Sequence, residues 1–188
     1  MSSPSPREPA ESEVEPDADP QSVARTICLR LLTAAPRTRV QLATALQRRG
    51  VPAEAATSVL DRLTAVGLID DEAYAAAWVQ SRHRGRGLAR RALGEELRRR
   101  GVSTETTTRA VAALDAEEEV ETARSLVRRR LAVTAGLPTP VRVRRLAGLL
   151  ARKGYPASVA GRVVREALEA DALVADECAD DWGGEPED

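Results

Sequence analysis

The chain of 188 residues contains no phenylalanine and only two tryptophans and two tyrosines. Its hydrophobic core must therefore be built mainly from leucine, valine and alanine, a composition that favours helix when arginine and glutamate are also abundant. Lysine is nearly absent as well, because Lys153 is the only one among 28 basic residues. This imbalance is typical of codon bias in a GC-rich genome, although arginine also suits bidentate contact with phosphate and carboxylate groups.

The scarcity of cysteine and histidine excludes several kinds of site. Cys28 lies in an apolar helical stretch and Cys178 in an acidic segment, so we expect no disulfide framework and a buried Cys28. His83, the only histidine, has no cysteine at metal-ligand spacing, and we expect a solvated residue at a helix end. No apolar run approaches the roughly 20 residues that span a membrane, and the acidic start does not resemble a signal peptide. These absences predict a soluble, cytoplasmic protein.

Motifs of enzymes and cofactor-binding proteins are missing too. Gly85-Arg86-Gly87 is too short for a dinucleotide-binding fingerprint, and the glycine-rich phosphate loop of nucleotide hydrolases is absent. No nucleophile, base and orienting residue stand in a recognisable set. We therefore expect no enzymatic activity, no metal and no cofactor.

The formal net charge of −1 hides a strong segregation of charge along the chain. Residues 1–20 contain six acids and one arginine, and residues 169–188 contain nine acids and no base. The remaining body, 21–168, has 27 basic and 14 acidic residues, a net charge of +13. Such a body attracts polyanions, and the acidic ends either screen it or only aid solubility.

A seven-residue motif recurs three times and divides the chain into repeats. It is LQRRGVP at 46–52, LRRRGVS at 97–103 and LARKGYP at 150–156. In each copy we expect the leucine to pack inward and the basic residues to complement the dipole of a helix's last turn. The glycine (Gly50, Gly101 or Gly154) is expected to end that helix in the left-handed conformation.

Apolar residues at helical spacing flank each copy of the motif and predict an all-α fold of three tandem three-helix repeats. About nine helices are expected, in an extended, curved array. We assign residues 21–69 to the first repeat, 70–114 to the second and 115–171 to the third. Residues 1–20 and 172–188 lack apolar periodicity and are predicted to be disordered acidic tails, the first of them rich in proline. Because each repeat needs only its neighbours for burial, we expect a monomer.

The most distinctive stretch lies at the start of the second repeat. Gly67-Leu68-Ile69-Asp70-Asp71 is followed by the pairs Tyr74-Ala75 and Ser81-Arg82, then by Gly87-Leu88 and by ELRRRGV at 96–102. Together these elements resemble the signature of the RecX family of regulatory proteins, over about residues 22–168. One departure is Arg100, which stands where lysine is frequent and keeps the charge.

The resemblance implies three tandem three-helix repeats, in agreement with the repeat motif. It also implies binding to RecA–DNA filaments, in the filament groove, and negative control of RecA's ATPase, strand exchange, recombination and SOS activity. Single- or double-stranded DNA is then a second partner, bound weakly and through its phosphates.

Two groups of residues in the signature have structural interpretations. Asp70 and Asp71 follow an apolar turn, so we interpret them as a helix cap and a dipole partner rather than an acid–base pair. Tyr74 and Trp78 are four residues apart and share a helix face. In a chain so poor in aromatics they are expected to anchor the central core, although stacking on nucleic-acid bases is an alternative.

The arginine clusters are the main candidates for partner binding, and those of the second repeat, from Arg82 to Arg100, are preferred. The candidates are Arg48, Arg49, Arg82, Arg84, Arg86, Arg90, Arg91, Arg98, Arg99, Arg100, Arg128, Arg129 and Arg130. A further cluster lies at Arg142, Arg144 and Arg145. A solvated, capping role is the alternative for each of them.

Two other functions stay open. The first is direct binding of nucleic acid by a helix-turn-helix-like unit, although no helix combines the residues that read base edges. The second is a purely structural scaffold for an acidic protein.

Overall fold

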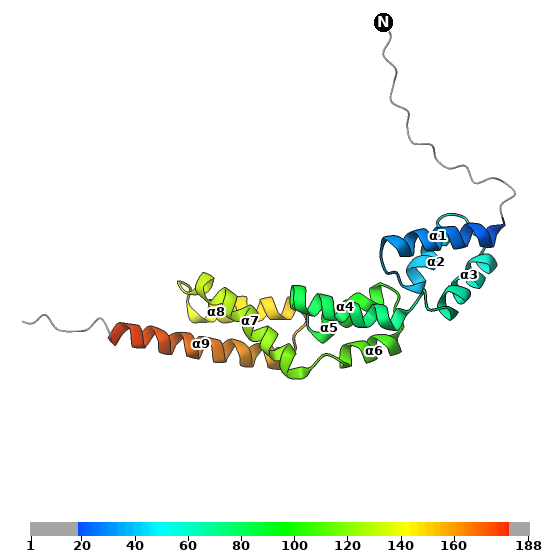
Figure 1. Ribbon diagram of the computed structural model, residues 1–188. Helices are drawn as coiled ribbons and strands as arrows, with labels where there is room; N and C mark the ends of the chain where they lie inside the picture. The colour runs from blue at the N-terminus through cyan, green and yellow to red at the C-terminus, as the bar shows by residue number, and fades with distance from the viewer. Residues whose placement is uncertain (1–18, 181–188) are drawn as a thin grey trace, which may run out of the picture. The chain divides into compact units, whose positions relative to one another are not determined.

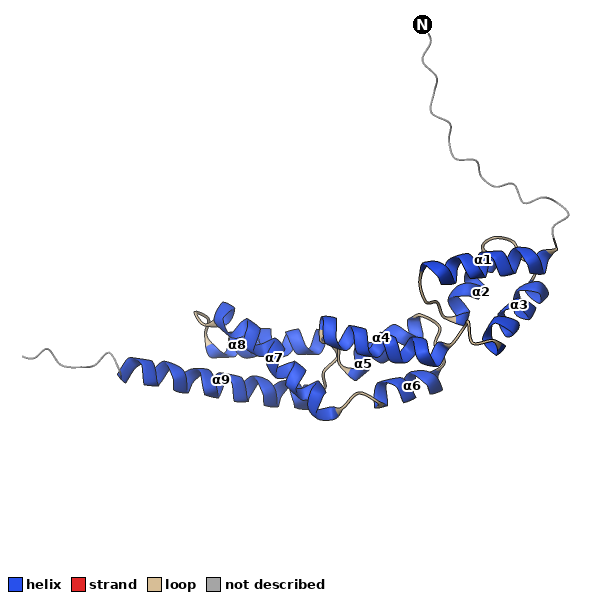
Figure 2. Cartoon of the chain, in the orientation of Figure 1, coloured by secondary structure: helices blue, strands red, loops and turns tan. Residues whose placement is uncertain are grey.

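The computed structural model describes residues 19–180, with side chains described to residue 173 (Figure 1; Figure 2). Within this range the protein consists of nine α-helices and has no strand, so the predicted all-α fold is confirmed. The helices are Pro20–Ala34 (α1), Arg39–Gln47 (α2), Ala53–Ala65 (α3), Asp71–Arg86 (α4), Arg90–Arg99 (α5), Thr104–Ala112 (α6), Ala116–Thr134 (α7), Thr139–Arg152 (α8) and Ala157–Asp180 (α9).

Side-chain caps explain where several helices begin. Asp19 caps α1, Ser103 caps α6 and Asp115 caps α7, each by accepting main-chain N–H bonds from the first turn. Asp70 caps α4 in the same way, with 3.0 and 2.8 Å bonds to its Oδ1, which confirms the predicted cap. The neighbouring Asp71 has a further role, because its Oδ1 accepts a bond from the N–H of residue 39 at 2.9 Å.

The three glycines of the repeated motif end α2, α5 and α8 with the same geometry. Their φ angles are +72° at Gly50, +83° at Gly101 and +90° at Gly154, as predicted. In each case the residue after the glycine donates its N–H to the carbonyl of the motif leucine, at 3.1–3.2 Å. These leucines are fully buried. The recurring sequence therefore corresponds to a recurring helix stop with a hydrophobic anchor.

The helices extend further into the acidic ends than the sequence predicted. Helix α1 begins at Pro20, and α9 continues to Asp180, so residues 172–180 are helical rather than part of a tail. Alanine recurs along this stretch and is the strongest helix former, which apolar periodicity alone does not detect. The rest of the predicted tails, residues 1–18 and 181–188, lies outside the described residues.

The chain divides into two compact units. The described part of the first comprises residues 19–37 and 41–69, and its core includes Cys28, Leu42, Leu46 and Leu60. Cys28 is buried, as predicted, and this burial raises the pKa of its thiol. Residues 38–40 belong to the second unit, where the Thr38 hydroxyl donates to the carbonyl of Arg100 at 2.7 Å.

The second unit contains α4 to α9 and has two cores. The first lies among α4, α5 and α6 around Leu93 and Leu97, and the second among α7, α8 and α9 around Val127 and Leu146. The α8–α9 turn joins them, because Ala89 donates its N–H to the carbonyl of Lys153 at 2.9 Å. The two three-helix groups therefore form one packed body.

Tyr155, in the same turn, strengthens this joint. Its side chain is buried, and its hydroxyl donates to the carbonyl of Gly87 at 3.2 Å. Burial raises the pKa of the Tyr155 hydroxyl well above its usual value, with a smaller effect from the charge of Glu119.

The expectation of a solvated His83 is wrong. The side chain is 2% exposed and lies between the two three-helix groups of the second unit. Its Nδ1 is 2.9 Å from the carbonyl of Leu88, and its Nε2 is 3.0 Å from the Thr122 hydroxyl on α7. A carbonyl oxygen only accepts hydrogen bonds, so the proton of the imidazole must be on Nδ1. The Thr122 hydroxyl is the hydrogen-bond partner of the other ring nitrogen, Nε2. The chain reverses direction at Gly87 and folds over this helix end, which the sequence around His83 does not reveal.

Candidate partner-binding surface

One face of α4 presents aromatic and basic side chains at every fourth position. Tyr74, Trp78, Arg82 and Arg86 follow this spacing, so they stack along the helix. The rings of Tyr74 and Trp78 lie 5.9 Å apart with an angle of 12° between their planes. The guanidinium of Arg82 lies 4.2 Å from the centre of the Trp78 ring, within the range of a cation–π contact.

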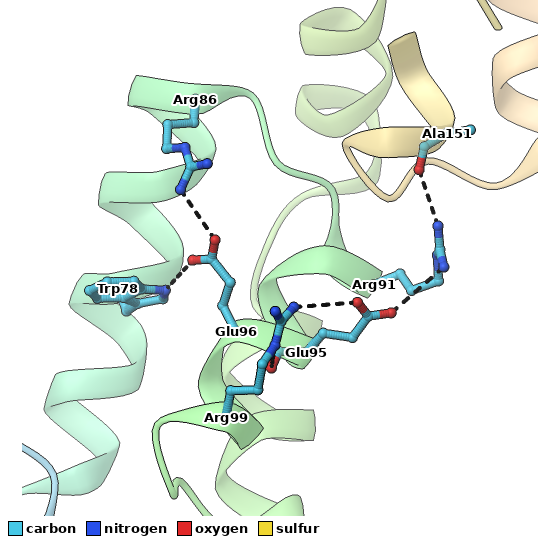
Figure 3. Close-up of polar contacts among 7 residues, drawn as sticks. All are labelled: Trp78, Arg86, Arg91, Glu95, Glu96, Arg99 and Ala151. Carbon is cyan, nitrogen blue, oxygen red and sulfur yellow. Dashed lines mark hydrogen bonds and ion pairs between the residues drawn. The ribbon is translucent and has the colours of Figure 1, made fainter. Parts of the chain in front are cut away.

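Helix α5 and the residue that ends it, Arg100, supply the other half of this surface. Glu96 points toward α4, where its Oε2 accepts a 3.0 Å bond from Trp78 Nε1 and its Oε1 a 3.3 Å bond from Arg86 (Figure 3). The Arg100 guanidinium lies 3.6 Å from the Trp78 ring centre and donates to the Tyr74 hydroxyl at 3.2 Å. Together the side chains at 74, 78, 82, 86, 96 and 100 form one connected group, here called the aromatic–arginine ladder.

The ladder lies at the rim of the α4–α6 core. As predicted, Tyr74 and Trp78 pack against this core, and both rings are partly buried. Two guanidiniums already contact the Trp78 ring. A nucleic-acid base would have to displace one of them in order to stack there, so base stacking is not favoured by this geometry.

Arg90 and Arg91 fix the third repeat to the second. Arg90 forms a 3.5 Å ion pair with Glu119 on α7, donates its main-chain N–H to the same carboxylate at 2.9 Å, and donates from its guanidinium to the Leu114 carbonyl. Arg91 reaches the carbonyl of Ala151 at the end of α8, at 3.2 Å (Figure 3). Both side chains therefore have structural partners within the protein.

The remaining candidates from the sequence separate into paired and unpaired side chains. Arg99 forms a 3.7 Å ion pair with Glu95, and Glu95 also pairs with Arg91. Arg49 donates a hydrogen bond to the carbonyl of Ala45. Arg128 donates to Glu121 at 2.7 Å and thereby holds the pKa of that carboxyl below its usual value. Among the described residues no hydrogen-bond or ion-pair partner is found for the side chains of the following candidates: Arg48, Arg84, Arg98, Arg129 and Arg130.

A second basic surface joins arginines from two of the predicted clusters with one that the sequence did not single out. Arg130 on α7 and Arg144, Arg145 and Arg152 on α8 line a surface hollow of about 480 Å³, here called the four-arginine hollow. From the sequence, Arg152 is expected only to complement the dipole at the end of its helix. The spacing of Arg145 and Arg152, two helical turns apart, could have linked them to one helix face.

Metal sites and membrane-spanning helices are not found in the described part of the chain. No group of three histidine, cysteine, aspartate or glutamate side chains is placed to hold a metal ion there. No helix among those residues has the length and apolar character required to cross a membrane.

Three family models match consecutive parts of the chain. They describe the first, second and third three-helix domains of RecX, and they match residues 24–63, 70–111 and 117–164. These ranges correspond to α1–α3, α4–α6 and α7–α9, the three groups of helices seen in the structure.

Several curated proteins and solved structures are similar to this chain. Regulatory protein RecX of Thermobifida fusca is 61% identical over 153 residues, which cover 81% of this chain and 83% of that protein. Regulatory protein RecX of Streptomyces coelicolor is 61% identical over 155 residues, covering 82% of each chain. The crystal structure of RecX from Lactobacillus salivarius has a TM-score of 0.74 at 16% identity, covering 78% of this chain and 96% of that one, so it supports the fold. The sequence identities and the three domain matches together show that the chain belongs to the RecX family of regulatory proteins.

Proposed function

We propose that this protein binds the RecA–DNA filament and negatively modulates RecA's ATPase, strand exchange and recombination or SOS activity. The main support is the 61% identity to proteins named Regulatory protein RecX, over more than four fifths of the chain. In this proposal the protein is a regulator without enzymatic activity, acts as a monomer, and works in the cytoplasm, where the filament assembles.

The geometry of the aromatic–arginine ladder suits a contact with an acidic protein surface. Arg82 and Arg100 are partly buried and held against Trp78, while Arg86 is 56% exposed and is held by Glu96. Side chains that are already ordered lose less entropy when they bind. Each guanidinium has five N–H donors, so groups remain for a carboxylate of the partner.

The proposed mechanism is a bridge between neighbouring RecA protomers. A helical repeat that contacts two protomers at once opposes any change in their relative position, and ATP hydrolysis in the filament is coupled to such changes. The same position hinders the approach of duplex DNA to the groove. Both effects lower RecA activity without chemistry by the regulator itself.

The test is RecA's single-strand-DNA-dependent ATP hydrolysis, titrated with the purified protein at fixed moderate salt. Inhibition is expected; inhibition well below one protein per RecA indicates end-capping, and inhibition near stoichiometric levels indicates groove coating. Unchanged hydrolysis with the protein in excess would contradict the proposal. Sequence-specific binding to bare DNA at physiological salt would support a helix-turn-helix-like function instead.

A paired set of variants tests the role of the ladder. Arg82→Gln with Arg86→Gln removes two charges from the ladder and is expected to raise the half-inhibiting concentration about tenfold, which corresponds to about 1.4 kcal/mol. Arg162→Gln with Arg165→Gln removes the same charge from α9, where both arginines already pair with glutamates. Equal losses in the two variants would show that only net charge matters.

A further inference from the structure

The arginines of the third repeat are divided between two faces. On the face toward α9, Arg124 pairs with Glu166 at 3.5 Å, and Arg142 pairs with Asp171 at 2.5 Å. Arg162 and Arg165, on α9 itself, pair with glutamates one turn further along. This face is therefore largely neutralised by the protein's own carboxylates.

The face formed by α7 and α8 is different. The lining of the four-arginine hollow contains no acidic residue, and its apolar part is Val133, Leu146 and Leu149. Among the described residues no carboxylate lies within ion-pair distance of any of the four arginines. The only other polar lining group is Thr134, whose hydroxyl donates back to the Leu131 carbonyl of its own helix.

Four unneutralised guanidiniums around one hollow repel one another and attract an anion with several charges. Arginine forms bidentate bonds with phosphate and with carboxylate alike, so charge alone does not select the partner. The shape of the surface decides between these partners. An amphipathic peptide helix needs a long apolar groove, and a peptide strand needs an exposed sheet edge; the hollow has three apolar side chains and lies between two helices.

We infer that the four-arginine hollow binds the phosphate backbone of DNA. Arg145 and Arg152 are seven residues apart on α8, about 10 Å along the helix axis. Measured along the duplex axis, a B-form strand presents a phosphate about every 3.4 Å, so a helix lying along that axis faces about three phosphates of one strand over this span. The hollow has no asparagine, glutamine or carboxylate, so arginine is its only base-reading side chain, and we expect binding to depend little on sequence.

This inference deepens the proposed function, on which it rests for its biological meaning: it assigns the DNA of the filament to the third repeat. The assay does not need RecA. A protein that binds DNA but does not inhibit RecA would contradict only the proposed function. A protein that inhibits RecA but does not bind DNA would contradict only this inference.

The experiment measures binding of a labelled 30-base-pair duplex and a labelled 30-nucleotide single strand by fluorescence anisotropy, over a series of NaCl concentrations. Arg145→Gln with Arg152→Gln is the test variant, and Arg162→Gln with Arg165→Gln is the control with the same change of charge in the same repeat. Thermal unfolding followed by circular dichroism verifies that both variants are folded.

We expect the test variant to bind duplex DNA about tenfold or more weakly at 0.1 M salt, with a log–log salt slope shallower by about 1.8, because two phosphate contacts are lost. For the single strand the change in slope is about 1.4. The control should keep the affinity of the natural sequence within about twofold, since its arginines are already paired.

Three results would overturn the inference. The first is no binding of the natural protein to either DNA at 50 mM salt. The second is an equal loss in test and control variants, which would indicate a general effect of net charge. The third is a test variant that binds DNA as well as the natural protein does but binds a labelled glutamate decamer more weakly, which would identify the hollow as a site for acidic peptides.

Discussion

Replacing Gly154 with alanine is expected to weaken the joint between the second and third repeats. Gly154 has a φ of +90°, and an added Cβ would lie 2.6 Å from the main-chain nitrogen of Ala92 and 2.7 Å from its Cβ. Neither atom is the free end of a flexible side chain, so α5 or the α8–α9 turn would have to move. The change therefore tests the packing of the whole second unit at one position.

The expected loss follows from three contributions. A non-glycine residue in the left-handed region costs about 1–2 kcal/mol, and forcing a methyl group into a packed contact costs about 1–3 kcal/mol. Alanine restricts the unfolded chain more than glycine does, and this stabilises the folded state by about 0.4–1 kcal/mol. The free energy of unfolding should therefore fall by about 3 kcal/mol.

Two other glycines provide matched controls. Gly50 has a φ of +72° and open space around its Cβ position, so Gly50→Ala has the strain without the contact and should cost about 1 kcal/mol. Gly161 lies inside α9, also with open space, and Gly161→Ala should stabilise by about 0.5–1 kcal/mol.

Urea unfolding followed by circular dichroism at 222 nm gives the free energies by linear extrapolation. The order of stability should be Gly161→Ala, natural sequence, Gly50→Ala and Gly154→Ala. If Gly154→Ala loses no more than Gly50→Ala, the close contact between the α8–α9 turn and α5 is refuted.

Three further predictions concern side chains of the second unit. Glu96→Ala removes the acceptor of the Trp78 indole N–H and should lower the free energy of unfolding by about 1–2 kcal/mol, measured by urea unfolding; a loss below about 0.3 kcal/mol would contradict this bond. His83→Ala removes a buried ring and its bond to Thr122, and a loss of about 2–4 kcal/mol is expected in the same assay; a loss like that of an exposed residue would contradict its burial. The pKa of Tyr155 is raised in the folded protein, so the contribution of this side chain to the free energy of unfolding is fully present below pH ~10, which is the pKa in the unfolded chain. That contribution decreases as the pH rises above this value. Stability measured between pH 9 and 11.5 should therefore fall more steeply for the natural protein than for Tyr155→Phe, and parallel curves would contradict this.

Much of the fold follows from local chemistry and was predictable. The repeated leucine–basic–glycine motif specifies a helix stop that depends only on neighbouring residues, and all three copies have the predicted conformation. The position of His83 depends instead on the chain after Gly87 folding back to bring Leu88 and α7 against the ring. No periodicity in the sequence shows such a long-range contact.

The candidate surface was predictable in composition but not in detail. The sequence shows that arginines are abundant and clustered, but adjacent arginines have different fates in the structure. Arg142 pairs with Asp171, 29 residues away, whereas Arg144 and Arg145 have no carboxylate partner among the described residues. Helix geometry sends neighbours to different faces, so a cluster in the sequence does not define a cluster in space.

The ladder and the hollow make different physical demands on a partner. Guanidiniums held against Trp78 are partly buried and already ordered, so a contact with them depends on shape and is screened less by salt. The arginines of the hollow are exposed and unpaired within the described chain, so the contact with phosphates that we propose for them would release counterions and weaken steeply with salt. When protein and DNA are joined in one filament, the first contact makes the second intramolecular, and the two affinities reinforce each other. On the proposed function, preference for the assembled filament over free RecA or bare DNA then needs no sequence-specific contact at all.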